Sequence, residues 1–264
     1  MTRIGELLNA RPAPLPLPEP GDVSAEQARL LISCVDATTL DSRDTPEVVM
    51  ALCDRAKELN VAAVCVHSYF VGGAKRCLTG AGIRVATVAG GFPHGLMTRS
   101  AVAADVAACV EQGADEVDIV IPRTLANRGE WEPLADRIGS AKDACGKARL
   151  KVILSTGELA DHDIIWKTSL VALAAGADFL KTSTGKEETN AELDTSAVML
   201  QAIAAWRDMT GETRGFKAAG GIRTGGQAWA FADLAAQIMG DKYLRPTKFR
   251  IGASSLLDDL SGRL

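Results

Sequence analysis

A lysine lies within a short apolar run at residues 177–186, which read Ala-Asp-Phe-Leu-Lys-Thr-Ser-Thr-Gly-Lys. Apolar runs of this length that end near a glycine are typical of a buried strand. Burial disfavours the charged form of Lys181 and lowers its pKa, and a neutral amine is a nucleophile toward carbonyl carbon. The sequence therefore predicts either a Schiff-base lysine at a strand end or a lysine that extends from that strand end to water.

A second lysine has similar surroundings: Lys217, in the segment Gly-Phe-Lys-Ala-Ala-Gly-Gly. If the two segments form adjacent strands, those strands lie about 4.8 Å apart. An ammonium group on Lys217 then disfavours protonation of Lys181 and leaves it as a neutral nucleophile. The pair favours the Schiff-base interpretation of Lys181 over the solvated one.

Two acids, Glu116 and Asp118, lie two residues apart in an otherwise apolar run and so share one face of a strand. Strands that are covered on both sides leave no solvated face for such acids. We expect Asp118 to pair with a buried lysine or to move protons. Lys151 begins another apolar run, where it is either a deep ion-pair partner of these acids or a surface residue at one end of the sheet.

Glycines and hydroxyls follow the last two predicted strands, as Gly220-Gly221 and as Gly252-Ala-Ser254-Ser255. Backbone N–H groups and hydroxyls at such positions, next to a helix N-terminus, form a phosphate site in barrel enzymes. Ordinary turn glycines are the alternative. Lys186 could add a positive charge to this site. Asp36 and Thr38 end the first predicted strand, where they are either pocket residues or turn and capping residues.

The elements that would position these residues alternate regularly along the chain. We predict strands at 32–36, 62–67, 84–89, 116–121, 150–155, 178–182, 215–218 and 249–252, and helices at 46–59, 71–79, 100–112, 131–144, 162–175, 195–209, 226–239 and 255–260. Eight strands alternating with eight helices indicate an α/β fold, a (β/α)8 TIM barrel in a single domain. A doubly wound open sheet is the alternative, but Asp-Ala-Thr-Thr-Leu follows the first strand instead of a Gly-x-Gly-x-x-Gly turn.

The N-terminal part differs in composition, with alternating prolines between residues 11 and 21. Alternating prolines exclude a helix or an inner strand and predict an extended arm. A short helix at 25–31, capped by Ser24, would follow it. We therefore expect residues 1–30 to form an arm with a short helix and residues 31–264 to form the barrel.

The composition limits the classes of partner. The formal net charge is −4 and no basic run occurs, which argues against a general nucleic-acid binder. No apolar stretch is long enough to span a membrane, and the first ten residues do not read as a secretory signal. Six scattered cysteines without a Cys-x-x-Cys pair, and three histidines, predict reduced thiols in a cytoplasmic protein and no metal site.

Seven segments together resemble the 2-deoxyribose-5-phosphate aldolase family of class I (Schiff-base) aldolases, from about residue 36 to residue 257. They are Asp36–Leu40, Val85–Val88 with Phe92–Gly95, Gly113–Asp118, Leu150–Ile153, Ala177–Lys186, Gly215–Thr224 and Arg250–Leu257. The resemblance implies that Lys181 forms the Schiff base, that Lys217 tunes it and shares in proton transfer, and that Asp118 relays protons. It also implies that Asp36, Thr38, Gly220, Gly221, Gly252, Ser254 and Ser255 bind substrate. We expect Thr184 and Lys186 to belong to the same substrate-binding set.

The resemblance further implies a lyase of deoxyribonucleotide catabolism and carbohydrate degradation that needs no cofactor and acts on phosphosugar and aldehyde substrates. We expect a homodimer or another homo-oligomer. The expected reaction is the reversible cleavage of 2-deoxy-D-ribose 5-phosphate to acetaldehyde and D-glyceraldehyde 3-phosphate. Two alternatives remain open at this point: a related Schiff-base aldolase for another phosphosugar, and a non-catalytic barrel that binds phosphosugars.

Overall fold

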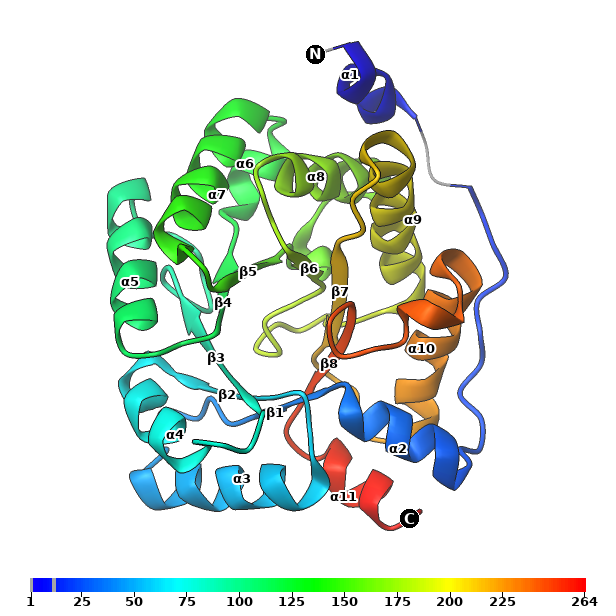
Figure 1. The fold of residues 1–264 in the computed structure, drawn as a ribbon. Coiled ribbons are helices and arrows are strands. Elements are labelled where there is room, and N and C mark those ends of the chain that lie inside the picture. The colour runs from blue at the N-terminus through cyan, green and yellow to red at the C-terminus, as the bar shows by residue number, and fades with distance from the viewer. Residues whose placement is uncertain (1, 11–12) are drawn as a thin grey trace.

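The computed structural model describes residues 2–10 and 13–264 and has a parallel barrel at its centre (Figure 1). In these residues, eight strands close in sequence order, from β1 next to β2 around to β8 next to β1. The strands are β1 (Val35–Thr38), β2 (Ala63–His67), β3 (Arg84–Ala89), β4 (Glu116–Val120), β5 (Arg149–Ile153), β6 (Phe179–Lys181), β7 (Gly215–Ala219) and β8 (Phe249–Ala253). The predicted (β/α)8 barrel is confirmed.

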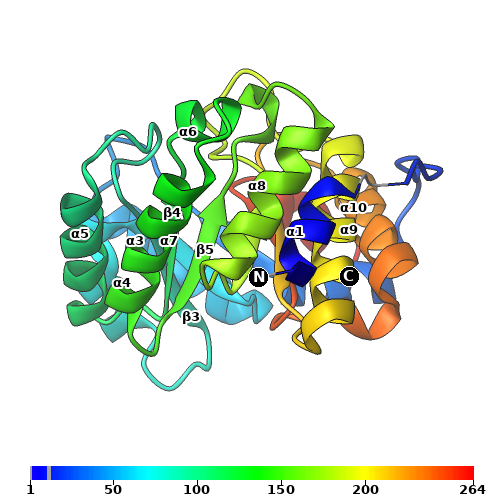
Figure 2. The same cartoon turned by 90° about the horizontal axis from the view of Figure 1, so that it is seen from above.

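Helices surround the barrel and cover the outer face of its strands (Figures 1 and 2). They are α1 (Thr2–Asn9), α2 (Ala25–Ser33), α3 (Pro46–Leu59), α4 (Val71–Cys77), α5 (Arg99–Glu111), α6 (Arg123–Asn127), α7 (Trp131–Cys145), α8 (His162–Ala174), α9 (Leu193–Thr210), α10 (Gly225–Met239) and α11 (Leu256–Ser261). One continuous apolar core joins the helices to the outward-facing strand residues. Strand residues therefore alternate between this core and the barrel interior.

Local sequence signals fix where several helices begin. A capping box starts α10, because Thr224 accepts a hydrogen bond from the backbone of Gln227 while the Gln227 side chain accepts one from the backbone of Thr224. The side chain of Asp161 caps α8 with a single hydrogen bond, which it accepts from the backbone N–H of Ile164. Such caps set the ends of the loops that join strands to helices, and the candidate site lies on those loops.

The first strand differs from its prediction, since β1 spans Val35–Thr38 and not residues 32–36. The helix α2 continues through Leu31 and Ile32, whose side chains are buried against the barrel, and ends at Ser33. An apolar run of this length suits a helix or a strand equally well, and here tertiary packing selects the helix. The helix thus also crosses the expected boundary of the arm at residue 30.

The described part of the proline-rich arm, residues 13–24, contains no helix or strand and passes outside α9 and α10 (Figures 1 and 2). Residues 11 and 12 of this arm lie outside the described residues. The backbone of Ala13 exchanges two hydrogen bonds with the side chain of Gln201 on α9, at 2.8 and 3.0 Å. The carbonyl of Leu7 in α1 accepts a hydrogen bond from the indole of Trp166 at 2.8 Å. The N-terminal segment is thereby attached to the outer face of the barrel.

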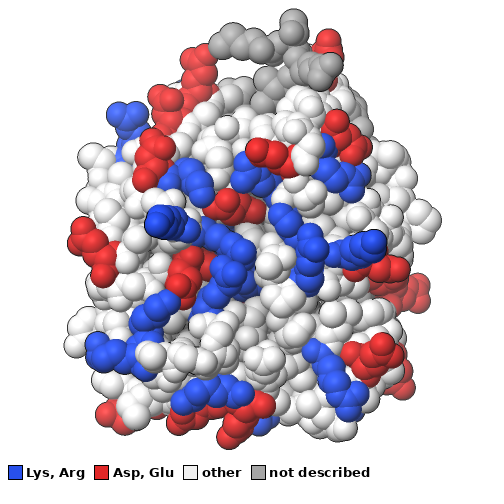
Figure 3. Space-filling model, in the orientation of Figure 1, with Lys and Arg blue, Asp and Glu red and all other residues white. Residues whose placement is uncertain are grey.

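Charged side chains are unevenly distributed on the surface. On the face seen in Figure 1, Lys and Arg side chains gather near the centre while most Asp and Glu side chains lie toward the rim (Figure 3). Among residues 2–10 and 13–264, no helix is both long and apolar enough to cross a membrane. Within the same ranges, no group of three or more His, Cys, Asp or Glu residues is placed to hold a metal ion.

Candidate active site

The two lysines singled out by the sequence lie side by side on adjacent strands, because the register pairs Lys181 of β6 with Lys217 of β7. Both side-chain nitrogens approach the same oxygen of Asp118 on β4. The distance from Oδ2 is 2.9 Å to Lys181 Nζ and 3.0 Å to Lys217 Nζ. One carboxylate oxygen thus connects the two amines, and a proton can be shared among the three groups.

Beneath this triad lies a larger network of buried charges. Lys217 Nζ is 2.5 Å from Oδ2 of Asp36 on β1. Lys151 Nζ is 2.7 Å from Oδ1 of Asp118 and 2.8 Å from Oε2 of Glu116. The side chain of Lys151 is fully buried, so the interpretation as a deep ion-pair partner is correct and that as a surface residue is wrong.

Sequence reasoning missed the residue at the bottom of the network, Arg250 on β8. Its guanidinium donates to Asp36 and, at 2.8 Å, to Oε1 of Glu116. The sequence signal is an arginine between Phe249 and Ile251, the kind of position at which a charged side chain is buried only when it is paired.

The electrostatic surroundings drive the pKa values of the two lysines apart. Burial lowers the pKa of Lys181, and the ammonium of Lys217 lowers it further, against the opposing effect of the Asp118 carboxylate. Burial alone would also lower the pKa of Lys217, but Asp118 and Asp36 together raise it above its ordinary value. Asp118 is desolvated, yet the surrounding lysines, Lys151 first, hold its pKa well below the usual range. Lys181 is thus the amine most easily deprotonated, and Lys217 remains an ammonium.

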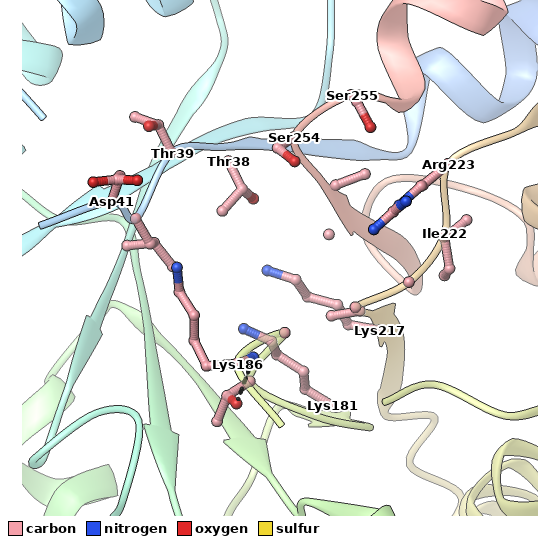
Figure 4. Close-up of a pocket in the computed structure, with 18 residues that line it drawn as sticks. Thr38, Thr39, Asp41, Lys181, Lys186, Lys217, Ile222, Arg223, Ser254 and Ser255 are labelled. Carbon is pink, nitrogen blue, oxygen red and sulfur yellow. Dashed lines mark hydrogen bonds between the residues drawn. The ribbon is translucent and has the colours of Figure 1, made fainter. Parts of the chain in front are cut away.

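A cavity of about 430 Å³ opens directly above the two lysines, at the carboxyl ends of the strands (Figure 4). The Lys181 and Lys217 side chains point into it together. Eight of the residues expected to bind substrate line its wall: Thr38, Thr184, Lys186, Gly220, Gly221, Gly252, Ser254 and Ser255. Asp36, the ninth, lies beneath the cavity and not on its wall.

Sequence reasoning also missed Arg223, which lines the cavity and directs its guanidinium toward it (Figure 4). Arg223 lies just before Thr224, the capping residue of α10. Neither Arg223 nor Lys186 has a carboxylate within 4.0 Å among the described residues. Two positive charges therefore face the same cavity, and no acid in the described part of the chain pairs with either. The signal in the sequence was an arginine immediately after Gly-Gly-Ile.

The glycine loop after β7 has a backbone that other residues adopt only with strain. Gly220 and Gly221 have φ values of +89° and +80°. A Cβ atom on Gly220 would also lie 2.4 Å from Oδ1 of Asn190. Glycine is thus required here by the turn and by the close approach of Asn190, and backbone N–H groups stay accessible to a ligand.

The loop after β6 is held by an acid that the sequence analysis did not consider. Glu187 Oε1 accepts hydrogen bonds from the hydroxyls of Thr184 and Ser155, at 2.9 and 2.7 Å. The hydroxyl of Thr184 in turn accepts the N–H of Lys186 at 3.1 Å. This local network orients Thr184 and Lys186 at the cavity wall.

The closed barrel defines the fold class of this protein, a (β/α)8 barrel with a lysine pair below an open cavity. The sequence matches the DeoC/LacD family aldolase over residues 30–262, and the chain belongs to this family.

Named relatives agree with that family. Deoxyribose-phosphate aldolase of Mus musculus is 43% identical over 251 residues, which cover 88% of this chain and 79% of that protein. The enzyme of the same name from Homo sapiens is 41% identical over the same shares of the two chains. A solved structure with the name deoxyribose phosphate aldolase, from Aeropyrum pernix, superposes with a TM-score of 0.69 at 25% identity and covers 90% of this chain and 95% of its own. The resemblance noted from the sequence is confirmed.

Proposed function

We propose that this aldolase reversibly cleaves 2-deoxy-D-ribose 5-phosphate to acetaldehyde and D-glyceraldehyde 3-phosphate through a Schiff base on Lys181. The observation that carries the proposal is the Asp118 oxygen shared by Lys181 and Lys217 at the floor of the cavity. The names of the relatives point to the same substrate. No group beyond the chain's own side chains is needed for covalent catalysis by an amine.

The first step is attack of neutral Lys181 on the aldehyde carbon of the open-chain sugar. Lys217, kept protonated by Asp36 and Asp118, donates a proton toward the hydroxyl of the resulting carbinolamine. Water leaves and an iminium forms at Lys181 Nζ. Asp118 accepts from both nitrogens and can return the proton through water. General acid–base assistance of this kind is typically worth about 10²–10⁴-fold.

The second step breaks the bond between C2 and C3. The iminium accepts the electron pair of that bond as the C3 hydroxyl gives its proton, through water, to Lys217, which donated its own in the first step. This releases glyceraldehyde 3-phosphate and leaves a neutral enamine on Lys181. Protonation of the enamine at C2 and addition of water then release acetaldehyde and restore the amine. The sequence of steps balances without an external oxidant or reductant.

The phosphate end of the substrate is proposed to lie against the cavity wall formed by the loops after β7 and β8, away from Lys181. Backbone N–H groups of Gly220, Gly221 and Gly252 and the hydroxyls of Ser254 and Ser255 offer hydrogen-bond donors there. Lys186 and Arg223 supply positive charge, and Thr38 and Thr184 also line the cavity. Anchoring the phosphate fixes the distance between the aldehyde and the amine. Asp36 contributes from beneath by holding Lys217.

We further propose that residues 31–264 form the catalytic domain and residues 1–30 an accessory arm. A cytoplasmic homo-oligomer is the expected form of the protein. The structure from Aeropyrum pernix is described as tetrameric, which supports oligomerisation without fixing the number of subunits here.

A panel of aldol donors and acceptors tests the substrate assignment. Acetaldehyde with glyceraldehyde 3-phosphate should give the highest rate of condensation, and 2-deoxyribose 5-phosphate the highest rate of cleavage. Preference for another donor would instead indicate a Schiff-base aldolase for a different phosphosugar. Binding of the sugar phosphate without turnover would indicate a non-catalytic barrel.

A further inference from the structure

The buried charges around Lys181 balance only when Lys181 is neutral. Three fully buried carboxylates, on Asp36, Glu116 and Asp118, face three buried cations, on Lys151, Lys217 and Arg250. A charge on Lys181 would be a fourth cation. Arg84 and Arg149 also approach Glu116, at 3.6 and 3.4 Å, but their side chains are 38% and 25% exposed and their charge is screened by water.

We propose that Arg250 is a positioning residue that keeps Lys181 in its neutral, nucleophilic form by completing this charge balance from the bottom of the barrel. The inference rests on the proposed role of Lys181 and extends it to a residue that does not line the cavity. Without Arg250 the network carries one excess negative charge. Protonation of Lys181 cancels that charge at the lowest cost in free energy.

The geometry of Arg250 suits this task. Its guanidinium bridges Asp36 and Glu116, lies 5.8 Å from the centre of the Phe179 ring, and donates to the carbonyl of Pro246. Strand register places Arg250 next to Lys217, with Asp36 one strand further on. A guanidinium keeps its charge at every accessible pH, so it can serve as a constant counter-charge where a lysine could itself lose a proton.

A chain of ion pairs connects Arg250 to Lys181. Arg250 pairs with Asp36 and Glu116, which pair in turn with Lys217 and Lys151. Both of these lysines pair with Asp118, whose other partner is Lys181. The ionisable groups around Lys181 come from six strands: Asp36 (β1), Cys65 (β2), Glu116 and Asp118 (β4), Lys151 (β5), Lys217 (β7) and Arg250 (β8). The same balance disfavours the cationic iminium relative to the neutral enamine, which favours cleavage of the carbon–carbon bond.

The test follows the pH dependence of adduct formation. Wild type, Arg250→Met, Arg250→Lys and the double variant Arg250→Met/Glu116→Gln are treated with 2-deoxyribose 5-phosphate and borohydride from pH 5 to pH 10, and the adduct on Lys181 is quantified by peptide mass spectrometry. The amount of adduct should rise with pH as Lys181 loses its proton, and this rise is the limb to compare. In Arg250→Met the limb should move to higher pH by about one unit, so that at a pH below the pKa of Lys181 the neutral amine is tenfold less abundant. Arg250→Lys keeps the charge, and its limb should stay within a few tenths of a unit of wild type.

The double variant separates charge from shape. Removing Glu116 together with Arg250 leaves two carboxylates and two cations, so the limb should return toward the wild-type position although both side chains are changed. A purely structural role for Arg250 would lower the amount of adduct at every pH without moving the limb, and that result would overturn the proposal.

Glu116→Gln alone provides an independent readout if Arg250→Met does not fold. It leaves one excess positive charge, so its limb should move to lower pH, opposite to that of Arg250→Met. An unmoved or raised limb in this variant would contradict the charge balance. Failure of the proposed function itself is distinct, because wild type would then give no adduct on Lys181 at any pH.

Discussion

Replacement of Gly252 by alanine tests whether the position of Lys217 limits the rate. Gly252 follows Arg250 by two residues on β8, so an alanine there would point its methyl group into the barrel. That Cβ would lie 2.9 Å from Cε of Lys217 and 3.1 Å from Cβ of Ala219. These distances are too short for carbon atoms, and the lysine side chain is the more mobile of the two neighbours.

Displacement of Lys217 has a definite cost, because its ammonium lies 2.5 Å from Asp36 and 3.0 Å from Asp118. A hydrogen bond to a charged group contributes about 1.5–3 kcal/mol. If the added methyl group breaks the bond to Asp118, and that bond acts in proton transfer, kcat should fall by about 10–150-fold. The assay couples release of acetaldehyde, the product that the phosphorylated and the unphosphorylated sugar share, to an alcohol dehydrogenase.

Two comparisons make the result specific. Gly139→Ala adds the same methyl group within α7, with no atom closer than 4 Å, and should leave kcat unchanged. Gly252 also lines the proposed phosphate site, so 2-deoxyribose without the phosphate serves as a second substrate. A loss of kcat with both sugars indicates Lys217, whereas a loss confined to the phosphorylated sugar indicates the phosphate site. A folded Gly252→Ala enzyme within twofold of wild type on both substrates would refute the reasoning.

Three further predictions concern single side chains. Lys217→Leu removes an ammonium that lowers the pKa of Lys181, so the limb of the pH–rate profile on which activity rises with deprotonation of Lys181 should move to higher pH, and an unmoved limb would show that Lys217 does not tune the nucleophile. Ser255→Asp places a negative charge at the proposed phosphate site and should raise KM for phosphorylated substrates far more than for 2-deoxyribose; equal increases would remove the phosphate assignment. Burial raises the pKa of Cys53 and of Cys109 to about 12, whereas Cys77 is partly exposed. A thiol reagent should therefore label Cys77 first in the folded protein, and rapid labelling of several thiols would contradict the packing.

Much of the fold could be predicted because its signals are local. The strand at residues 84–89 and the helix at residues 46–59 have the predicted bounds, since glycine, proline and capping residues mark their ends. The error at β1 arose where an apolar run fits both a helix and a strand. The helix α1 was not predicted, because a segment of eight residues is stabilised by its contact with Trp166 and not by its own sequence.

The site residues that local patterns position could also be predicted, whereas those that depend on distant parts of the chain could not. Period-two alternation placed Glu116 and Asp118 on one inward face, and strand adjacency brought Lys181 next to Lys217. The position of Asp36 beneath the cavity depends on Arg250 from the other end of the chain, 214 residues away. Closure of the barrel makes β1 and β8 neighbours. Local sequence patterns do not predict which distant residue pairs with a buried charge.

Borohydride trapping with 2-deoxyribose 5-phosphate, followed by peptide mass spectrometry, tests the central claim most directly. We predict a reduced adduct on the peptide that contains Lys181. In Lys181→Leu both the adduct and turnover should be lost completely. An adduct on Lys217 instead would keep the reaction class but exchange the roles of the two lysines. Absence of any adduct, from folded protein that still binds the sugar phosphate, would contradict the Schiff-base account.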